Sequence, residues 1–351
     1  MIKTKLRNFL NSHVKVPRFP FPSEIEFEPI QLCNALCFTC PYTRLQKDNN
    51  YKGKKMSREQ IKFLLTDFAG LIKKNRYNGP TIINPFRYSD PLVCKDLDLI
   101  LELAKKNRLN VKITTNGVSF NDYYSGLLNK YINSLASPID ISVIGSNAEN
   151  IKKNMNVNLE ITLARLKKLK ENYPRLASLV RVNLSEVDES KNERVEIENL
   201  KSIFLSIGFI VNVRKKWINN RIVGDWKITA NSMHDQNSFI IGCNLYRNKL
   251  LRRIEVMVDG SVVLCDDDAE GKLKFGNVFD DGIEKIWNGK LLKYHKKIYN
   301  KNYSNDKKNL ICNSCSRAET KKNIYGFTDT FLQTGKFKIL KHALKPNVEW
   351  F

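Results

Sequence analysis

The chain has 351 residues, of which 42% are hydrophobic, and its 59 Lys and Arg against 36 Asp and Glu give a formal net charge of +23. This composition excludes an intrinsically disordered chain, and the length predicts two domains, or one barrel-sized domain with an appendage. No stretch approaches the apolar length of a membrane span, and Met1 to Phe21 lacks the apolar run of a signal peptide, so we expect a cytoplasmic protein without a membrane span.

Short apolar strands alternate with amphipathic helices through the first two thirds of the chain. The strands are predicted at residues 24–30, 80–86, 111–115, 139–144, 179–184 and 209–213. The first helix follows the capping box Ser57-Arg58-Glu59-Gln60. Further apolar residues at helical spacing predict helices near 97–104, 123–135, 159–169 and 195–204. This alternation predicts a parallel sheet with helices outside it and active residues at the carboxyl ends of the strands.

Three of the eight cysteines lie close together after the first predicted strand, as Cys33-x3-Cys37-x2-Cys40. Because a cytoplasmic chain keeps its thiols reduced, the spacing indicates metal or redox chemistry rather than disulfides. Three thiolates on one loop can hold three irons of a cubane cluster and leave the fourth iron open to a substrate or cosubstrate. A structural zinc site needs four ligands, and no His or further Cys lies nearby in the sequence. We therefore expect a [4Fe–4S] cluster on this loop.

This cysteine loop resembles the signature of the radical S-adenosylmethionine (SAM) family. The resemblance implies an α/β fold, a partial (β/α)6 TIM-like barrel, in which the open iron binds S-adenosylmethionine. It also implies a reductant such as flavodoxin or ferredoxin, cleavage of S-adenosylmethionine to a 5′-deoxyadenosyl radical, and hydrogen abstraction from a substrate. In the family an aromatic residue usually precedes the third cysteine. Here Thr39 holds that position and Phe38 precedes it, and the resemblance assigns cofactor binding to both.

The resemblance extends to short motifs at the ends of the next predicted strands. Tyr88-Ser89-Asp90-Pro91 stands where the family commonly has Gly-Gly-Glu-Pro, so Ser89 and Asp90 are expected to bind the cofactor. Thr115-Asn116-Gly117 resembles the family's Thr-Asn-Gly, and Ser142 matches a serine that often contacts S-adenosylmethionine. Asn116 and Ser142 therefore join the expected cofactor-binding residues. Each motif also occurs as an ordinary turn or strand hydroxyl.

Four later cysteines predict a second metal site, at Cys243, Cys265, Cys312 and Cys315. Between the first two, residues 254–258 and 261–264 flank Asp259-Gly260 and have the alternation and the turn of a β-hairpin. This hairpin, with segments 275–278 and 286–289, resembles the twitch subdomain, the abbreviated form of the SPASM domain. The resemblance implies one auxiliary [4Fe–4S] cluster with four cysteine ligands. A four-cysteine zinc ribbon needs the same ligand count.

The predicted organisation has four parts: an N-terminal basic extension (1–22), a radical SAM partial barrel (23–226), a small β-hairpin and helix SPASM/twitch domain for the auxiliary cluster (227–324) and a C-terminal tail (325–351). Trp217, Asp225 and Trp226 resemble a family loop between barrel and twitch domain. The eighth cysteine, Cys94, lies just past Asp90. It is either a hydrogen donor to a substrate radical, as in epimerases of the family, or a buried small apolar residue.

The resemblance leaves the substrate open, because relatives of this type act on aminocyclitols, sugars or peptides. Only 32 residues precede Cys33, too few for a leader-peptide-binding domain. We therefore expect oxidoreductase or epimerase-type chemistry on a sugar, aminocyclitol or related small polyol: dehydrogenation, epimerisation or dehydration. Peptide or protein modification is the alternative. Arg181, Asn183 and Arg214 have the alternation of residues that face the barrel interior.

The net charge also raises the hypothesis of a nucleic-acid-binding protein with structural zinc. The basic residues are scattered through predicted helices, as in Lys105-Lys106 and Lys167-Lys168, and through loops such as Lys307-Lys308. No helix-turn-helix or RNA-binding strand pattern accompanies them. We therefore expect no nucleic-acid partner and interpret the charge as favouring a small-molecule substrate that is anionic.

Overall fold

The computed structural model describes residues 17–47, 51, 53–187, 190–214, 240–243, 249–299, 312, 315, 318–320 and 349–350. The chain forms two compact units. The first comprises Met1–Ile25, Asp67–Thr81 and Asp225–Phe351, and the second comprises Glu26–Thr66 and Ile82–Gly224. The predicted domain boundaries near residues 226 and 324 lie outside the described residues.

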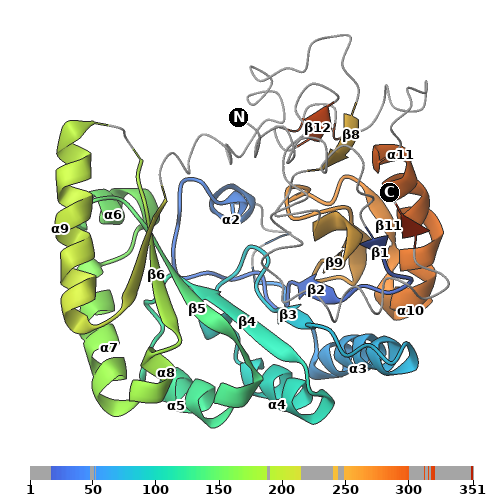
Figure 1. Ribbon diagram of the computed structural model, residues 1–351, viewed down its shortest axis with the longest axis horizontal. Helices are drawn as coiled ribbons and strands as arrows, with labels where there is room; N and C mark the ends of the chain where they lie inside the picture. The colour runs from blue at the N-terminus through green and yellow to red at the C-terminus, as the bar shows by residue number, and fades with distance from the viewer. Residues whose placement is uncertain are drawn as a thin grey trace, which may run out of the picture. The chain divides into compact units, whose positions relative to one another are not determined.

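The second unit is built on a sheet whose strands lie in sequence order, β2-β3-β4-β5-β6-β7 (Figure 1). Their bounds are β2 Glu24–Phe27, β3 Ile82–Asn84, β4 Asn110–Thr115, β5 Leu135–Ile144, β6 Val180–Ser185 and β7 Ile210–Arg214. Strands β3 to β7 pair in parallel. The predicted parallel α/β architecture is therefore confirmed.

Helices connect consecutive strands of this sheet, and helices α4 to α9 lie along one of its faces (Figure 1). They are α4 Leu97–Asn107, α5 Asp122–Lys130, α6 Ala148–Met155, α7 Leu159–Asn172, α8 Pro174–Ala177 and α9 Lys191–Ile207. Two short segments precede them, α2 Pro41–Leu45 and the 3-10 turn η1 Pro91–Val93. Helix α3, Arg58–Lys74, has residues in both units.

Local sequence signals explain where these helices begin and end. The predicted capping box precedes α3: Gln60 N donates to Ser57 Oγ, and Ser57 N donates to Gln60 Oε1. Helix α9 begins after Ser190, whose side chain accepts from Glu193 N, and ends at Gly208 with φ of 93°. A positive φ favours glycine, so Gly208 ends the helix at little cost.

The two faces of the sheet differ in polarity because successive strand residues point to opposite sides. Ile139, Ile141 and Val143 of β5, like Val182 and Leu184 of β6, are at most 3% exposed and form the core beneath the helices. We define the inner face as the opposite face of β4–β7. It carries Lys112, Asp140, Ser142, Arg181, Asn183, Asn212 and Arg214, in register along the parallel ladder.

Several predicted bounds differ from the structure, and the differences around β2 and β5 have a local explanation. The first strand ends at Phe27, and Ile30 forms an isolated bridge with Lys55. The predicted helix 123–135 ends at Lys130, and β5 begins at Leu135 rather than at residue 139. Pro138 lies inside β5, where an irregular register opposite Lys112–Thr114 accommodates a residue that lacks an N–H donor.

The first unit contains the predicted hairpin. Strands β9 Arg253–Val256 and β10 Ser261–Val263 pair antiparallel. Gly260 in the turn has φ of 84°, and a Cβ there would lie 2.4 Å from Phe279 Cδ2. Its other elements are β1 Pro17–Arg18, β8 Ile240–Cys243, η5 Lys249–Leu251, β11 Lys274–Asn277, α10 Val278–Ile286, η6 Trp287–Leu291, α11 Leu292–Tyr299, β12 Ala318–Thr320 and β13 Glu349–Trp350.

Trp287 is the centre of a buried cluster in this unit and is fully buried. Its Nε1 donates to Phe19 O at 2.9 Å, and the Arg18 guanidinium lies 4.2 Å from its ring centre. Arg18 Nε also donates to His295 Nδ1 at 3.1 Å. The cation–π contact and the hydrogen bonds stabilise the packing of residues 18–19 against η6 and α11.

None of the helices in the described part of the chain is both long and apolar enough to cross a membrane.

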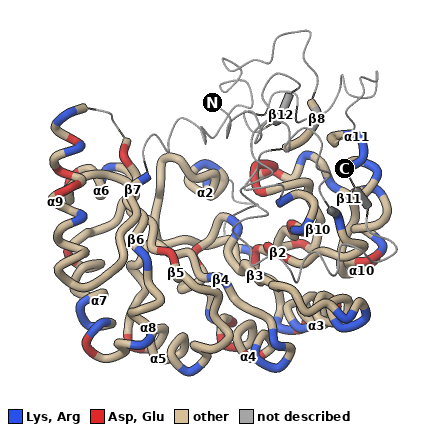
Figure 2. The backbone as a smooth tube through the Cα atoms, viewed as in Figure 1, with Lys and Arg blue, Asp and Glu red and all other residues tan. Residues whose placement is uncertain are grey.

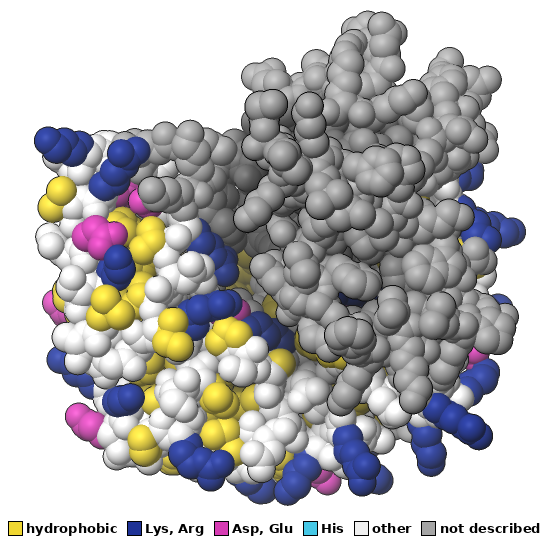
Figure 3. All heavy atoms as spheres, viewed as in Figure 1, with side chains coloured by type: hydrophobic (Ala, Val, Ile, Leu, Met, Phe, Trp, Pro, Cys, Tyr) yellow, Lys and Arg dark blue, Asp and Glu magenta, His cyan; other side chains and the backbone are white. Residues whose placement is uncertain are grey.

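Charged residues lie on the helices and also within the strands (Figure 2). In the face shown in Figure 3, Lys and Arg side chains are spread over several parts of the surface.

Candidate active site and auxiliary metal site

The cysteine loop follows β2 and leads into α2. Cys33, Cys37 and Cys40 are all partly buried. Cys40 N donates to Cys37 O at 2.9 Å, and Thr43 Oγ1 donates to the same carbonyl at 2.6 Å. Pro41 is the first residue of α2, where a proline fits without loss of a backbone bond. These contacts set the path of the chain between the second and third cysteines.

Backbone hydrogen bonds tie this loop to the carboxyl ends of neighbouring strands. Asp90 N, beyond β3, donates to Leu32 O at 3.4 Å. Leu36 N donates to Met155 O at 2.8 Å, and Phe38 N donates to Asn154 O at 2.9 Å. Met155 is the last residue of α6, which follows β5. The three thiols are therefore held at the edge of the sheet where active residues are expected.

Asn116, directly after β4, joins the sheet to the first cysteine. Its Nδ2 donates to Asn34 Oδ1 at 2.6 Å and points to Cys33 Sγ at 3.8 Å. Asn34 Nδ2 in turn donates to Ser119 Oγ at 2.8 Å. Val118 N donates to Asn116 Oδ1, which fixes the amide orientation. Asn116 is thus placed to hydrogen-bond a metal-bound Cys33 thiolate.

Asp90 is 2% exposed and its carboxylate accepts hydrogen bonds from three donors. Oδ1 accepts from Leu92 N at 2.9 Å, and Oδ2 accepts from Asn116 N at 2.9 Å. Thr115 Oγ1 reaches both oxygens, at 3.0 and 2.8 Å. Burial raises the pKa of this carboxyl, and these hydrogen bonds oppose the rise. Here Asp90 connects the segment after β3 to the end of β4, and its direct contact with a cofactor stays a prediction.

The other predicted cofactor-binding residues differ in exposure. The Phe38 ring is 46% exposed, whereas Thr39 is 7% exposed. Ser89 is partly buried, and its Oγ donates to Phe86 O at 2.7 Å. Ser142 lies on the inner face of β5, in register with Asn183. Of the two residues before the third cysteine, the exposed Phe38 offers the larger accessible surface, and the roles of all four residues stay predictions.

The thiols of the loop interact with one another. Burial raises the pKa of Cys33 to about 12, with a smaller contribution from the negative charges of Asp90 and Cys40. Burial and the charges of Cys40 and Cys33 likewise raise the pKa of Cys37. Burial and the neighbouring negative charges therefore disfavour ionisation of Cys33 and Cys37. A positively charged metal group removes this cost, so the donor set fits one.

The distances between the sulfur atoms distinguish one metal ion from a cluster. The Sγ atoms of Cys33, Cys37 and Cys40 do not all lie within 4.8 Å of one another. Thiolates around one zinc ion, with bonds of about 2.3 Å in a tetrahedron, would lie about 3.8 Å apart. In a four-iron cluster each thiolate binds a different iron and the thiolates are farther apart. The three thiols are therefore not arranged around a single zinc ion.

The first unit brings together the four later cysteines. Cys243 in β8 pairs with Ala318 in β12, and Ala318 N donates to Cys315 O. Cys315 N donates to Cys312 O in the preceding turn. Burial raises the pKa of Cys265, with contributions from nearby aspartates and from Cys312 and Cys315. Cys265 therefore lies near the close pair, and a shared metal site of all four cysteines stays a prediction.

Ion pairs and backbone hydrogen bonds support the loop after β10. Arg253 Nε lies 2.5 Å from Glu255 Oε1, and Arg253 Nη2 lies 3.3 Å from Asp266 Oδ2. Asp266 and Asp267 place carboxylate oxygens within 4.8 Å of Cys265 Sγ and of each other. Asp268 accepts from Lys272 N and Leu273 N, each at 2.9 Å. The segment that presents Cys265 is fixed by ion pairs and backbone bonds.

Residues 243–316 match the SPASM family, described as an iron–sulfur cluster-binding domain, and this range contains all four later cysteines. The second unit has the parallel sheet and the three-cysteine loop of the radical SAM fold. The chain has the radical SAM fold with a SPASM domain. The prediction of an iron–sulfur cluster in the C-terminal part is confirmed, in preference to a zinc ribbon.

Solved structures support this fold at low sequence identity. The radical SAM fold of this chain is similar to native anSMEcpe with bound AdoMet and Cp18Cys peptide, with a TM-score of 0.53, 13% identity and coverage of 91% of this chain and 96% of that one. It is similar to Streptococcus suis SuiB bound to the precursor peptide SuiA, with a TM-score of 0.52, 15% identity and coverage of 82% and 67%. For BtrN in complex with AdoMet and 2-DOIA, the TM-score is 0.49 and the identity is 16%, with coverage of 79% of this chain and 87% of that one. No curated protein sequence gives a significant match.

The inner face of the radical SAM sheet carries a connected polar network. Lys112 Nζ lies 2.7 Å from Asp140 Oδ2. Arg181 Nε and Asn183 Nδ2 both donate to Asp140 Oδ1 at 2.8 Å. Asn212 Nδ2 donates to Asn183 Oδ1 at 3.0 Å. The expected inward direction of Arg181 and Asn183 agrees with these bonds, which also involve Asp140, Lys112 and Asn212, residues that the sequence analysis did not single out.

Other predicted residues fall outside the loop and the network. Cys94 is 3% exposed, and burial raises its pKa to about 11. This burial suits a small apolar residue, and its role as a hydrogen donor stays a prediction. Trp217, Asp225 and Trp226 lie outside the described residues. Asn34, within the cysteine loop, has no sequence signal, because its partner Asn116 is 82 residues away.

Proposed function

We propose that this protein is a radical SAM enzyme. The observation that carries the proposal is the Cys33, Cys37 and Cys40 loop, which is hydrogen-bonded to segments at the carboxyl ends of strands of the parallel sheet. A [4Fe–4S] cluster bound to such a loop would supply the electron that cleaves S-adenosylmethionine to methionine and a 5′-deoxyadenosyl radical. That radical would take a hydrogen atom from a substrate.

The residues of the chain bind and orient these groups. Three cysteines hold three irons and leave one iron for S-adenosylmethionine. Asn116 donates an N–H to Cys33 Sγ, and Asp90 fixes the backbone on which Asn116 stands. The exposed ring of Phe38 offers an apolar surface for the adenine, and Ser142 offers a hydroxyl on the inner face. A one-electron donor such as flavodoxin or ferredoxin belongs to the same proposal.

We propose a small polyol, a sugar or an aminocyclitol, as the substrate, with dehydrogenation, epimerisation or dehydration as the reaction. The inner face supports this class because it presents amide, carboxylate and cationic side chains, which hydrogen-bond hydroxyl groups. Peptide modification is the second candidate. It is supported by the peptides bound in two similar structures, those of SuiB and anSMEcpe.

The test is cleavage of S-adenosylmethionine by the anaerobically purified protein reduced with dithionite. We expect 5′-deoxyadenosine and methionine from the wild type, none from Cys40→Ala, and wild-type amounts from Ser178→Ala, which alters an exposed serine after α8. Deuterium transfer into 5′-deoxyadenosine from perdeuterated polyols supports the small-molecule class. Transfer only from labelled peptides supports the second candidate. No cleavage by iron-loaded wild-type protein contradicts the proposed function.

A further inference from the structure

The segment that follows the third cysteine of the loop is strongly basic. Residues 41–56 contain one carboxylate, Asp48, and five cations: Arg44, Lys47, Lys52, Lys54 and Lys55. The formal net charge of this segment is therefore five minus one, or +4. The side chains of Lys47, Lys54 and Lys55 are exposed. Net charge alone affects solubility and association rates and does not define a site, so the position of these lysines decides what they can do.

Backbone hydrogen bonds hold the second half of this segment beside the residues that precede Cys33. Gln31 N donates to Lys54 O at 2.8 Å, and Lys55 forms an antiparallel bridge with Ile30. Because Gln31 is two residues before Cys33, both lysines lie beside the start of the cysteine loop. These contacts use backbone atoms, so a change of the lysine side chains leaves them in place.

Two buried tyrosines of the same segment lie next to the thiols. Tyr42 on α2 packs against Tyr51, with ring centres 6.4 Å apart, and Tyr51 Oη donates to Glu28 Oε1 at 2.6 Å. Burial raises the pKa of Tyr42, and the charges of Cys33 and Cys40 add to the rise. The lysines that follow the two tyrosines along the chain are exposed. A positive surface therefore borders the cysteine loop.

Acidic side chains at the margin of this surface are paired with an arginine. Burial raises the pKa of Cys94, the charges of Asp96 and Asp98 add to the rise, and the charge of Lys55 opposes it. These three charged groups therefore lie near one thiol. Asp96 and Asp98 both accept from Arg58 Nη1, at 2.7 and 3.4 Å. The surface is thus positive beside the cysteine loop and of mixed charge beyond it.

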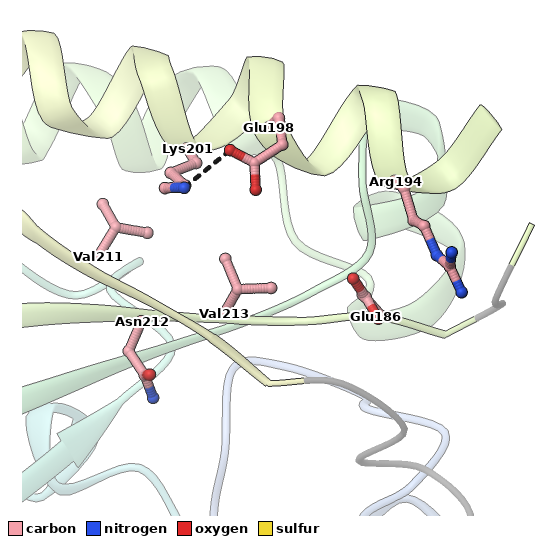
Figure 4. A pocket seen from close by; sticks show the side chains of 7 residues that line it. All are labelled: Glu186, Arg194, Glu198, Lys201, Val211, Asn212 and Val213. Atoms are coloured by element: carbon pink, nitrogen blue, oxygen red, sulfur yellow. Dashed lines mark hydrogen bonds and ion pairs between the residues drawn. The ribbon is translucent and has the colours of Figure 1, made fainter. Parts of the chain in front are cut away.

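A second charged surface of the same unit has a different balance of charge. Glu186, Arg194, Glu198 and Lys201 line a cavity of about 290 Å³ between α9 and β7. Figure 4 shows Lys201 beside Glu198, with Lys201 Nζ and Glu198 Oε2 2.7 Å apart. Two cations and two carboxylates meet there, so this surface does not select a partner of either charge.

We propose that Lys47, Lys54 and Lys55 form the docking surface for an acidic one-electron carrier protein of the flavodoxin type. This inference rests on the proposed function and names the partner of that same site. Electron transfer slows steeply with distance, so a carrier has to dock beside the loop that binds the cluster. One electron leaves the reduced carrier and enters the oxidised cluster, and no covalent bond forms or breaks. Opposite charges on the two proteins raise the rate of encounter and fix its orientation.

The experiment is isothermal titration of the anaerobic, iron-loaded protein with oxidised flavodoxin at low ionic strength. Lys54→Glu, Lys55→Glu should bind flavodoxin roughly tenfold or more weakly than the wild type, because repulsion replaces attraction. At about 1 M salt, where the Debye length is about 3 Å, this difference should disappear.

Two adjacent lysines of α4 provide the matched control. Lys105 and Lys106 are exposed and lie in the last turn of this helix, which leads into the start of β4. The cysteine loop is hydrogen-bonded to segments at the opposite, carboxyl ends of the strands. Lys105→Glu, Lys106→Glu therefore makes the same change of charge away from the loop, and it should bind flavodoxin nearly as tightly as the wild type does.

Cleavage of S-adenosylmethionine is measured in the same samples with two reductants. At subsaturating flavodoxin, cleavage should slow in Lys54→Glu, Lys55→Glu and not in the α4 control. Dithionite needs no docking surface, so with it both variants should match the wild type.

Three results would overturn the inference: flavodoxin does not bind the wild type, it binds Lys54→Glu, Lys55→Glu equally tightly, or the α4 control loses as much affinity. A random oligonucleotide that binds through Lys54 and Lys55 when flavodoxin does not would assign the surface to nucleic acid instead. Any of these results together with normal cleavage under dithionite rejects the docking surface alone. No cleavage by the iron-loaded wild type under dithionite rejects the proposed function itself.

Discussion

Asn116 connects the parallel sheet to the cysteine loop through a single side chain. Its amide contacts both Asn34 and Cys33 Sγ, and its own backbone N–H is held by Asp90. N–H donors to a cysteine sulfur stabilise the more negative, reduced state of an iron–sulfur cluster. We therefore propose that Asn116 is a positioning residue that also influences the reduction potential of the proposed cluster.

Replacing Asn116 with Ala should lower the reduction potential of the cluster and slow S-adenosylmethionine cleavage roughly 10–100-fold, the usual cost of losing a partner of a metal ligand. Potentiometric titration followed by electron paramagnetic resonance measures the first effect. Asn107→Ala, on α4, is the control because its amide donates to Leu103 O of the same helix and not to the cysteine loop. An unchanged potential in Asn116→Ala would exclude the proposed N–H donation.

His295 gives a prediction on pH dependence. Burial and the charge of Arg18 lower its pKa well below the usual 6.5. The folded protein therefore binds this proton more weakly than the unfolded chain does, and stability should fall as pH drops below 6.5. This group should therefore contribute a progressive loss of stability between pH 6.5 and pH 5.0.

Anaerobic urea unfolding at the two pH values tests this prediction. His295→Gln keeps an acceptor for Arg18 but does not titrate, so its free energy of unfolding should lose less between pH 6.5 and pH 5.0 than that of the wild type. Identical pH dependence in the two proteins would show that His295 is not held neutral by its surroundings.

At the residue scale, sequence spacing predicts the metal ligands better than their supports. Cys33, Cys37 and Cys40 are close in sequence, so their shared loop is visible without a structure. Asn34 and Asn116 meet only because the loop after β2 returns to the end of β4. Short-range patterns contain no information about such a contact between distant segments.

At the scale of elements, α6 has a role that its length does not suggest. This eight-residue helix begins after Asn147, which accepts from Asn150 N, and ends at Met155. Its last two carbonyls accept from Leu36 N and Phe38 N of the cysteine loop. The helix therefore links the end of β5 to the cysteine loop through these two hydrogen bonds.

Asn147→Ala should lower the stability of α6 by about 1 kcal/mol, the usual cost of losing a helix cap. The loop should then lose its iron to a chelator several-fold faster than in the wild type, as followed by the decay of cluster absorbance. Asn158→Ala is the matched control, because Asn158 caps α7 through Glu160 N and Ile161 N. Equal rates of iron loss in the two variants would mean that α6 does not secure the loop.

The sequence predicts a helix or hairpin best where a periodic apolar pattern coincides with a capping or turn motif. The capping box before α3 and the hairpin turn at Gly260 appear where the sequence predicts them. Helix α6 was missed because its two turns contain few apolar residues, and its stability comes from buried Ile151 and Met155. The early start of β5 was missed because Pro138 resembles a strand breaker.

At the scale of the whole molecule, the two units each contain one group of cysteines. The second unit holds Cys33, Cys37 and Cys40, and the first holds Cys243, Cys265, Cys312 and Cys315. The SPASM match covers the second group. Because each group lies within its own unit, loss of one site should leave the other able to bind iron.

The central claim is that the chain holds two four-iron clusters, and the most direct test is iron and acid-labile sulfide per chain after anaerobic reconstitution. We expect about eight irons in the wild type, about four in the Cys33→Ala, Cys37→Ala, Cys40→Ala triple variant, and about four in Cys312→Ala, Cys315→Ala. Zinc in place of iron, or an iron content that does not change in either variant, would contradict the account.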